Sequence, residues 1–351
     1  MLNILKIFLP AVISFLVGIT ITPILTRYFY RYKLWKKTAR IVDNPDLMSE
    51  AFKKINNGET ETKTPRVGGS IIWISILITI SIVYLLRILF GGELLGKLDF
   101  LSRNQTLLPL LALILGGLFG LFEDFVEIFS DKFSSIKQGL PSKYLILLVS
   151  FIGLIAGLYF FIKLGIRDIY IPFFGYWHVD WFFIPIFIIV VLGTFSSRVI
   201  DGIDGLAGGV MAITYGAFGT IAFFQNQIDI ATLCFVTSGA ILAFLWFNIP
   251  PARFYMGETG MLGLTLMLAF ISFLTDSVLL LPIIGILLVA TSFSSFIQII
   301  SKKFFKRKIF KIAPLHHHFE AIGWSREKIT MRYWILSLMF AILGILIALI
   351  G

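Results

Sequence analysis

The chain has 351 residues, of which 58% are hydrophobic and only 14% are charged. A soluble domain of this size needs more polar surface, so the composition excludes the soluble classes and indicates a membrane protein. The chain has 30 Lys and Arg residues against 20 Asp and Glu residues. In a soluble chain this excess would suggest nucleic-acid binding. In a membrane protein the basic residues gather in cytoplasmic loops, so their positions first predict the orientation of the spans.

Apolar segments recur along the whole chain, and a helical span needs about 20 such residues. Ten segments qualify, at approximately 5–26, 69–90, 106–124, 143–163, 181–198, 205–224, 228–247, 259–275, 278–300 and 331–350. The first segment resembles a signal peptide, but its apolar run is too long and lacks a convincing cleavage site. We therefore predict an all-α integral membrane protein, a bundle of about ten transmembrane helices that forms one polytopic domain over residues 1–351.

The basic residues predict the orientation of these spans. The loops at approximately 27–68, 123–142, 198–204, 248–258 and 302–330, with their edges, carry 24 of the 30 Lys and Arg residues. Because positive charge gathers in cytoplasmic loops, we predict that these five loops are cytoplasmic and that both termini are extracytoplasmic. The predicted location is the cell membrane, with multiple passes and no nucleic-acid partner.

Two pairs of acidic residues lie in or beside these loops. Glu123 and Asp124 end the third span, where the helix macrodipole disfavours negative charge, so they need a cation, a proton or full solvation. Asp201 and Asp204 are three residues apart and each precedes a glycine. They either cap the sixth helix or bind a ligand on one face of a turn.

Three of the four histidines are consecutive in the last basic loop, at His316, His317 and His318. Consecutive side chains on a helix point about 100° apart, so a zinc site, whose ligands are normally spaced, fits poorly. Binding of a phosphate or diphosphate together with the basic run from 302 to 311 fits better. That basic run also suits anionic lipid headgroups.

A fourth polar group, with Asn248, Tyr255 and Glu258, lies before and at the start of the eighth span. Glu258 has a plain structural interpretation as a carboxylate near a helix N-terminus. However, the predicted orientation places all four polar groups on the same face of the membrane. Carboxylates beside basic residues and histidines predict an active-site cleft on the cytoplasmic face and a Mg²⁺-assisted reaction of a phosphorylated substrate.

Five motifs occur in an order typical of one family. They are TPRVGG (64–69), FEDF (122–125), DGIDGLAGG (201–209), FYMGETG (254–260) and APLHHHFEAIGW (313–324). With its ten spans, the chain resembles the polyprenyl-phosphate N-acetylhexosamine-1-phosphate transferase superfamily over almost its whole length. The histidine motif is the most specific and resembles the phospho-N-acetylmuramoyl-pentapeptide-transferase (translocase I) branch. The first and third motifs are also similar to the N-acetylglucosamine-1-phosphate branch.

The resemblance implies a reaction of peptidoglycan synthesis. Undecaprenyl phosphate attacks the β-phosphate of UDP-N-acetylmuramoyl-pentapeptide, which releases UMP and forms lipid I. The resemblance also implies Mg²⁺, surrounding membrane lipid and a homodimer. Two alternatives stay open: the donor is UDP-N-acetylglucosamine, or the chain is a non-catalytic relative that binds lipid phosphate or nucleotide.

The resemblance further implies site residues. Asp124 is expected to activate the lipid phosphate with Glu123 beside it, and Glu258 with Asp124 to hold Mg²⁺. Asp201 and Asp204 are expected on the nucleotide side of the site. The other implied catalytic residue is His317, and the implied substrate-binding residues are Lys63, Arg66, Arg198, Asn248, Tyr255, His316 and His318.

The chain departs from the family pattern at three places. Glu123 and Glu258 stand where the family usually has Asp, which lengthens each side chain by one methylene. Phe195 and Arg198 stand where the family usually has two asparagines. From the sequence, the Arg198 cation either neutralises Asp201 or binds a phosphate directly.

Overall fold

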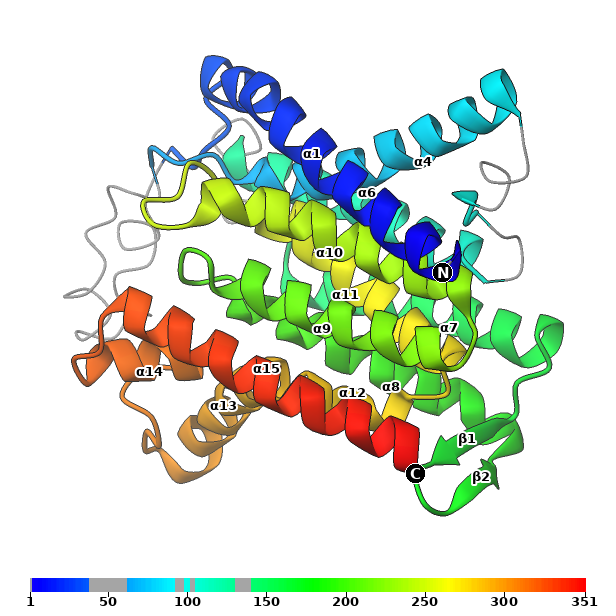
Figure 1. Cartoon of the computed structure of the whole chain (residues 1–351). Coiled ribbons are helices and arrows are strands. Elements are labelled where there is room, and N and C mark those ends of the chain that lie inside the picture. The colour runs from blue at the N-terminus through cyan, green and yellow to red at the C-terminus, as the bar shows by residue number, and fades with distance from the viewer. Residues whose placement is uncertain (1, 38–61, 92–97, 102–104, 130–139) are drawn as a thin grey trace.

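A computed structural model describes residues 2–37, 62–91, 98–101, 105–129 and 140–351 (Figure 1). Ten helices in these residues are long and apolar enough to cross a membrane, which confirms the predicted all-α membrane fold. Much of the predicted loop 27–68 and part of the loop 123–142 lie outside the described residues.

The helices that contain the spans follow the apolar segments closely. They are α1 (Leu2–Arg31), α4 (Ser70–Phe90), α6 (Leu107–Ile128), α7 (Ser142–Leu158), α8 (Phe183–Ser196), α9 (Leu206–Phe224), α10 (Ile228–Asn248), α11 (Gly257–Leu274), α13 (Ile286–Phe305) and α15 (Arg326–Ile350). Short 3₁₀ turns precede α4 at Val67–Gly69 and follow α8 at Ser197–Ile200, and a π-helical turn, Tyr159–Lys163, continues α7. The ninth span begins later than predicted, because α12 (Leu281–Ile284) ends at Gly285 and α13 starts after it.

Helix α11 lies at the centre of the bundle. In its most apolar window 89% of the residues are buried, against 22% for α1 and for α15. Glycines let α6 approach α11 closely: a Cβ on Gly116 would lie 2.7 Å from the Cα of Gly263, and a Cβ on Gly120 would overlap the carbonyl of Glu258. This seam of small residues is typical of membrane helix pairs, and it brings the acidic end of α6 against the start of α11.

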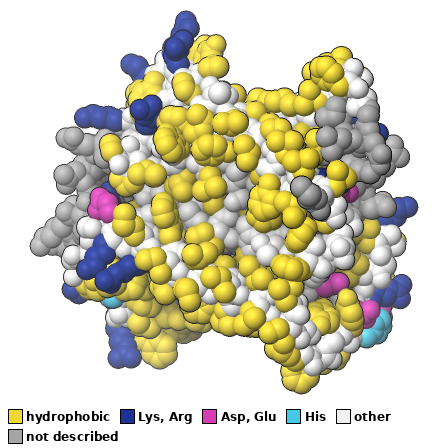
Figure 2. Space-filling model, viewed as in Figure 1, with side chains coloured by type: hydrophobic (Ala, Val, Ile, Leu, Met, Phe, Trp, Pro, Cys, Tyr) yellow, Lys and Arg dark blue, Asp and Glu magenta, His cyan; other side chains and the backbone are white. Residues whose placement is uncertain are grey.

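The two ends of the bundle differ. Both termini lie at the same end as the hairpin of β1 (Asp168–Ile171) and β2 (Gly175–His178), an antiparallel pair that the sequence analysis did not predict (Figure 1). The short helix α14 (Leu315–Ala321), which carries the three consecutive histidines, lies at the other end. Figure 2 shows hydrophobic side chains over the middle of the molecule and most of the visible Lys and Arg side chains toward the α14 end. The polar clusters therefore share one end of the bundle, and the assignment of that end to the cytoplasm remains a prediction.

Candidate active site

The start of α11 is the point at which the acidic residues converge. The backbone N–H of Gly257 donates to Asp201 Oδ2 at 3.0 Å. The N–H groups of Glu258 and Thr259 donate to the two oxygens of Asp124, at 3.3 and 2.8 Å. The Thr259 hydroxyl adds a bond of 2.6 Å to Asp124 Oδ2. Two carboxylates from other elements thus cap α11, where the helix dipole stabilises negative charge.

This arrangement changes the expected environment of Asp124. Helix α6 runs one turn further than predicted, to Ile128, so Asp124 lies inside the helix and is fully buried. Its negative charge is stabilised by the N-terminus of a second helix and not by solvent. The macrodipole of its own helix, on which the sequence analysis relied, is therefore outweighed by a tertiary contact.

A short backbone pairing brings Arg66 to the acids. The N–H of Tyr255 donates to the Pro65 carbonyl at 2.8 Å, which holds the segment before α4 against the turn before α11. Arg66 Nη2 then lies 3.1 Å from Glu127 Oε2 on α6. Burial acts to lower the pKa of Arg66, but Glu127 and the other acids outweigh it and raise the pKa above its usual value. Arg66 therefore stays charged within the cluster.

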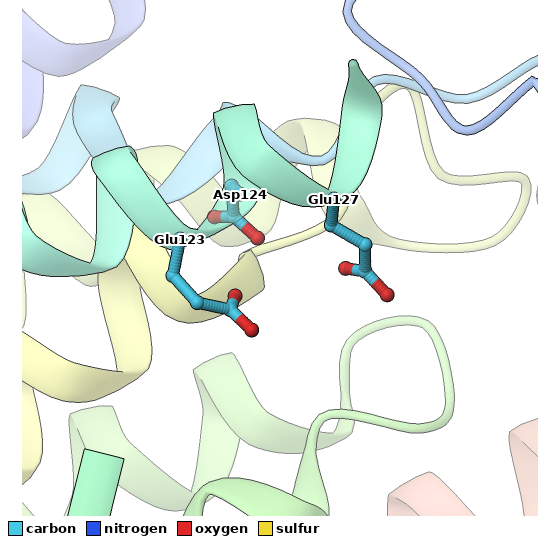
Figure 3. Close-up of side chains that lie close together, drawn as sticks. All are labelled: Glu123, Asp124 and Glu127. Carbon is cyan, nitrogen blue, oxygen red and sulfur yellow. The ribbon is translucent and has the colours of Figure 1, made fainter. Parts of the chain in front are cut away.

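Three carboxylates of α6 lie together: Glu123, Asp124 and Glu127 each offer an oxygen within 4.8 Å of the others (Figure 3). Glu127 was missed by the sequence analysis, although its spacing of four residues from Glu123 indicates the same helical face. Glu127 is paired with Lys36 as well as with Arg66. Glu123 differs, because its Oε2 is buried without a hydrogen-bond partner among the described residues.

Arg198 is paired with Glu258. Its Nη1 donates to Glu258 Oε1, and its guanidinium carbon lies 4.6 Å from the centre of the Phe195 ring. Two of the three departures from the family pattern thus compensate each other, since an added cation meets the lengthened acid. The sequence left two roles open for Arg198, neutralisation of Asp201 or binding of a phosphate. In the structure its acidic partner is Glu258 and not Asp201.

A cavity of about 570 Å³ opens over these residues. One side carries the acids Glu123, Glu127, Asp201 and Glu258, with Arg66 and Arg198 among them. The basic wall carries Lys302, Lys308, Lys311 and His317. The cavity thus combines groups that attract a cation with groups that bind phosphate.

Asp201 lines the cavity from the turn between α8 and α9. Burial raises its pKa to about 6, although the bond from the Gly257 N–H and the nearby Arg66 act to lower it. Its carboxylate holds the start of α11 and lines the cavity at the same time. Asp201 therefore caps a helix, which is α11 and not the predicted sixth span, and it also lines the cavity. The two roles that the sequence left open for it, helix cap and ligand-binding residue, are compatible.

Only His317 of the three consecutive histidines lines the cavity. Its Nδ1 forms a hydrogen bond of 2.9 Å with Glu320 Oε2, and Arg326 Nε donates to the other oxygen of Glu320 at 2.6 Å. Burial acts to raise the pKa of Glu320, but the bonds from His317 and Arg326 lower it overall. The ionised Glu320 therefore fixes the orientation of the His317 ring.

The other two histidines pack against the protein and do not line the cavity. His316 is fully buried beside Gly202, neither of its ring nitrogens has a partner among the described residues, and burial holds its pKa well below the usual value. His318 Nδ1 accepts the N–H of Lys311 at 3.2 Å, and its ring packs edge-on against Phe310. The three side chains thus point in different directions from α14, as expected for consecutive residues of a helix.

Two predicted ligand residues brace the turn between α10 and α11. Asn248 Oδ1 accepts the N–H of Gly205 at 2.9 Å, and its Nδ2 donates to the Phe254 carbonyl at 2.8 Å. Asp204 Oδ2 accepts the N–H of Ala252 at 3.2 Å, and burial raises its pKa. The predicted site residues that are absent from the cavity lining are Asp124, Asp204, Lys63, Asn248, Tyr255, His316 and His318.

The acidic side of the cavity fits a hard divalent cation. Its donors are carboxylate oxygens, which Mg²⁺ prefers together with phosphate and water. The buried Glu123 Oε2 lacks a partner among the described residues, and a cation would satisfy it. Glu258 lines the same cavity and would add a further carboxylate.

Comparison with known proteins gives consistent results over the chain. Residues 106–276 match the profile of glycosyl transferase family 4. The phospho-N-acetylmuramoyl-pentapeptide-transferase of Bacillus cytotoxicus is 31% identical over 340 residues, which cover 95% of each chain. The protein of the same name from a Geobacillus species is 32% identical over 344 residues, 97% of each chain. That from Rubrobacter xylanophilus is 35% identical over 236 residues, 65% of this chain and 70% of its own.

Proposed function

The chain belongs to the phospho-N-acetylmuramoyl-pentapeptide-transferase family, and we propose from this membership and from the cavity how it carries out the reaction. It is a phosphoglycosyl transferase and a multi-pass protein of the plasma membrane. It transfers phospho-N-acetylmuramoyl-pentapeptide from the UDP donor to undecaprenyl phosphate, which gives lipid I and UMP. The observation that carries the proposal is the cavity itself, whose lining combines four acidic residues with a set of basic residues.

The basic wall is the proposed binding site of the donor diphosphate. Lys302, Lys308 and Lys311 present ammonium groups, and His317 presents a ring held by Glu320. Charge-assisted hydrogen bonds to phosphate oxygens are about twice as strong as neutral ones. These residues therefore orient the donor so that its sugar-linked phosphate lies over the acidic side.

The acidic side is the proposed site of Mg²⁺. Glu123, Glu127 and Glu258 are the lining residues that would hold it, with Asp124 beneath them as the acid that fixes the start of α11. When bound, Mg²⁺ supplies Lewis-acid stabilisation of the charge that develops on the transferred phosphate. Glu123 rather than Asp124 is the proposed group that meets the lipid phosphate, because Glu123 lines the cavity and Asp124 is enclosed.

A second, apolar groove is the proposed binding site of the polyprenyl chain of the lipid acceptor. It has a volume of about 350 Å³ and lies between α8, α12 and α13. It lies next to the cavity: Ser197 and Phe296 line the groove, and their chain neighbours Arg198 and Ser295 line the cavity. A polyprenyl chain in this groove would place its phosphate head at the acidic side.

The chemistry is a displacement at phosphorus. A lipid-phosphate oxygen forms a bond to the sugar-linked phosphorus of the donor, and the bond from that phosphorus to the UMP oxygen breaks. A carboxylate at Glu123 receives the proton when the attacking phosphate carries one. The basic wall holds the negative charge that passes to UMP, which stabilises the leaving group.

The test is a transferase assay with the purified full chain, undecaprenyl phosphate and Mg²⁺. UDP-N-acetylmuramoyl-pentapeptide should give lipid I and UMP, whereas UDP-N-acetylglucosamine should give no lipid product. Product from the second donor alone would replace the proposed donor, and UMP from neither donor would refute the transferase reaction. The homodimer implied by the family remains a prediction, which the mass of the purified protein in detergent tests.

A further inference from the structure

The ion pair of Arg198 and Glu258 joins two elements that line the cavity. Arg198 comes from the 3₁₀ turn after α8, and Glu258 comes from the first turn of α11. Their side chains are only 18% and 19% exposed, and both line the cavity. The Phe195 ring lies 4.6 Å from the guanidinium carbon, so an aromatic contact supports the arginine beside its ion pair.

The same carboxylate is a candidate ligand of the divalent cation. Glu258 lines the same cavity as Glu123 and Glu127, whose oxygens lie close enough together to share one cation. In the structure the charge of Glu258 is met by Arg198. A guanidinium and a bound metal ion would therefore compete for one carboxylate.

Arg198 also has donors to spare. A guanidinium carries five N–H groups, and one contact of Arg198, from Nη1 to Glu258, is a hydrogen bond among the residues that the structure describes. Its planar fork matches the oxygens of a phosphate better than a lysine ammonium does. A donor diphosphate on the neighbouring basic wall would thus offer Arg198 a second anionic partner.

We propose that Arg198 is a positioning residue that exchanges partners when the donor binds. It leaves Glu258 for a phosphate oxygen of the donor, and Glu258 then becomes free to bind the divalent cation. This inference rests on the proposed function, because it takes a UDP-linked diphosphate as the ligand of the cavity. Its consequence is positive and reciprocal coupling: each ligand tightens the binding of the other.

The experiment measures metal binding and not turnover. Mn²⁺ is titrated into the full chain in detergent, without lipid phosphate, and free Mn²⁺ is read by electron paramagnetic resonance. The titration is repeated with saturating UDP-N-acetylmuramoyl-pentapeptide, and chelation by the donor alone is measured without protein and subtracted. We expect the donor to lower the Mn²⁺ dissociation constant about tenfold, within the usual range of coupling between sites.

Arg198→Gln is the informative variant. Without its competitor, Glu258 should bind Mn²⁺ about tenfold more tightly in the absence of donor, and added donor should then change the affinity little. Arg198→Lys keeps the charge but loses the fork, so it should retain weak binding of Mn²⁺ alone and show a smaller effect of donor. This second variant also covers the case in which the Gln variant fails to fold.

Lys302→Gln is the matched control. It removes one positive charge from the same cavity and leaves the Arg198–Glu258 pair intact, so the donor should still tighten Mn²⁺ binding by the same factor. Equal effects of the Lys302 and Arg198 variants would overturn the proposal in favour of general electrostatics. Independent binding of donor and Mn²⁺ to the unaltered chain would overturn it and leave the proposed function standing. Failure to bind the donor at all would overturn both.

Discussion

The hydroxyl of Thr259, at the start of α11, donates to the carboxylate of Asp124 on α6 at 2.6 Å, and both residues are fully buried. This bond ties the acidic end of α6 to the helix that carries Glu258. Because the Thr259 N–H donates to the same oxygen, the two helices are held in one register at the site.

Thr259→Val should test this link. Valine keeps the shape of threonine and removes the hydroxyl, and a hydrogen bond to a charged group contributes about 1.5–3 kcal/mol. We expect the free energy of unfolding to fall by roughly that amount, measured by denaturation in detergent. Thr259→Ser retains the hydroxyl and serves as the control, so equal stability of the two variants would contradict this role of the bond.

Glu127→Gln should act on stability. Glu127 compensates both Arg66 and Lys36, and its side chain is only 10% exposed. Removal of one member of a buried charge network leaves cations uncompensated and costs about 3–5 kcal/mol. We expect a clear drop in melting temperature, and an unchanged melting temperature would refute the structural role of Glu127.

Glu123→Gln should act on the reaction with little effect on stability. No ion pair of Glu123 is found among the described residues, and Gln has nearly the same size. Loss of a group that takes part in proton transfer typically lowers the rate by about 10²–10⁴-fold. We expect kcat to fall by at least about 10²-fold with little change in melting temperature, and normal turnover would remove Glu123 from the mechanism.

Asp201 should give the stability a dependence on pH. Its pKa is raised to about 6 in the folded chain and is about 3.9 in the unfolded chain, so the folded state binds the proton more tightly. Its favourable contribution is therefore complete below about pH 3.9 and is lost as the pH rises through about 6. Asp201→Asn mimics the protonated acid and can still accept the Gly257 N–H, so its stability relative to the unaltered chain should rise between pH 4 and 7. A constant difference across this range would contradict the shift.

Gly120→Ala should loosen the seam between α6 and α11. The added Cβ would overlap the Glu258 carbonyl, which is backbone and cannot rotate away. Overpacking of this kind costs about 1–3 kcal/mol and should displace Glu258, so both stability and turnover should fall. Gly216→Ala on α9 is the control, because no atom of the described residues outside its own stretch of helix lies within 4 Å of its Cβ position. Similar losses in both variants would point to helix effects in general and not to the seam.

The sequence predicted the spans well because each is a local property of about 20 residues. Their number and most of their boundaries are confirmed. The predicted gathering of the polar motifs also agrees with the structure, in which residues of all five motifs line one cavity, since the alternation of spans determines at which end each loop lies.

The contacts within the site were not predictable in the same way. Local spacing indicates that Glu127 shares a face with Glu123, but it does not show that the start of α11 packs on Asp124. Likewise, Arg198 is 60 positions from Glu258, and only the packing of α8 against α11 brings them together. The roles of Asn248 and Asp204 in bracing a turn depend on the path of that turn, which the motif pattern does not contain.

The capping of α11 has one more consequence. The free N–H groups at a helix N-terminus are a common binding site for phosphate. In this chain the N–H groups of Gly257, Glu258 and Thr259 are already taken by carboxylates. A helix end that ordinarily attracts anions has thereby become a surface that attracts cations and repels an unneutralised diphosphate. Recognition of the donor diphosphate is left to cationic side chains such as Lys302, Lys308 and Arg198, so donor affinity should weaken as the salt concentration rises.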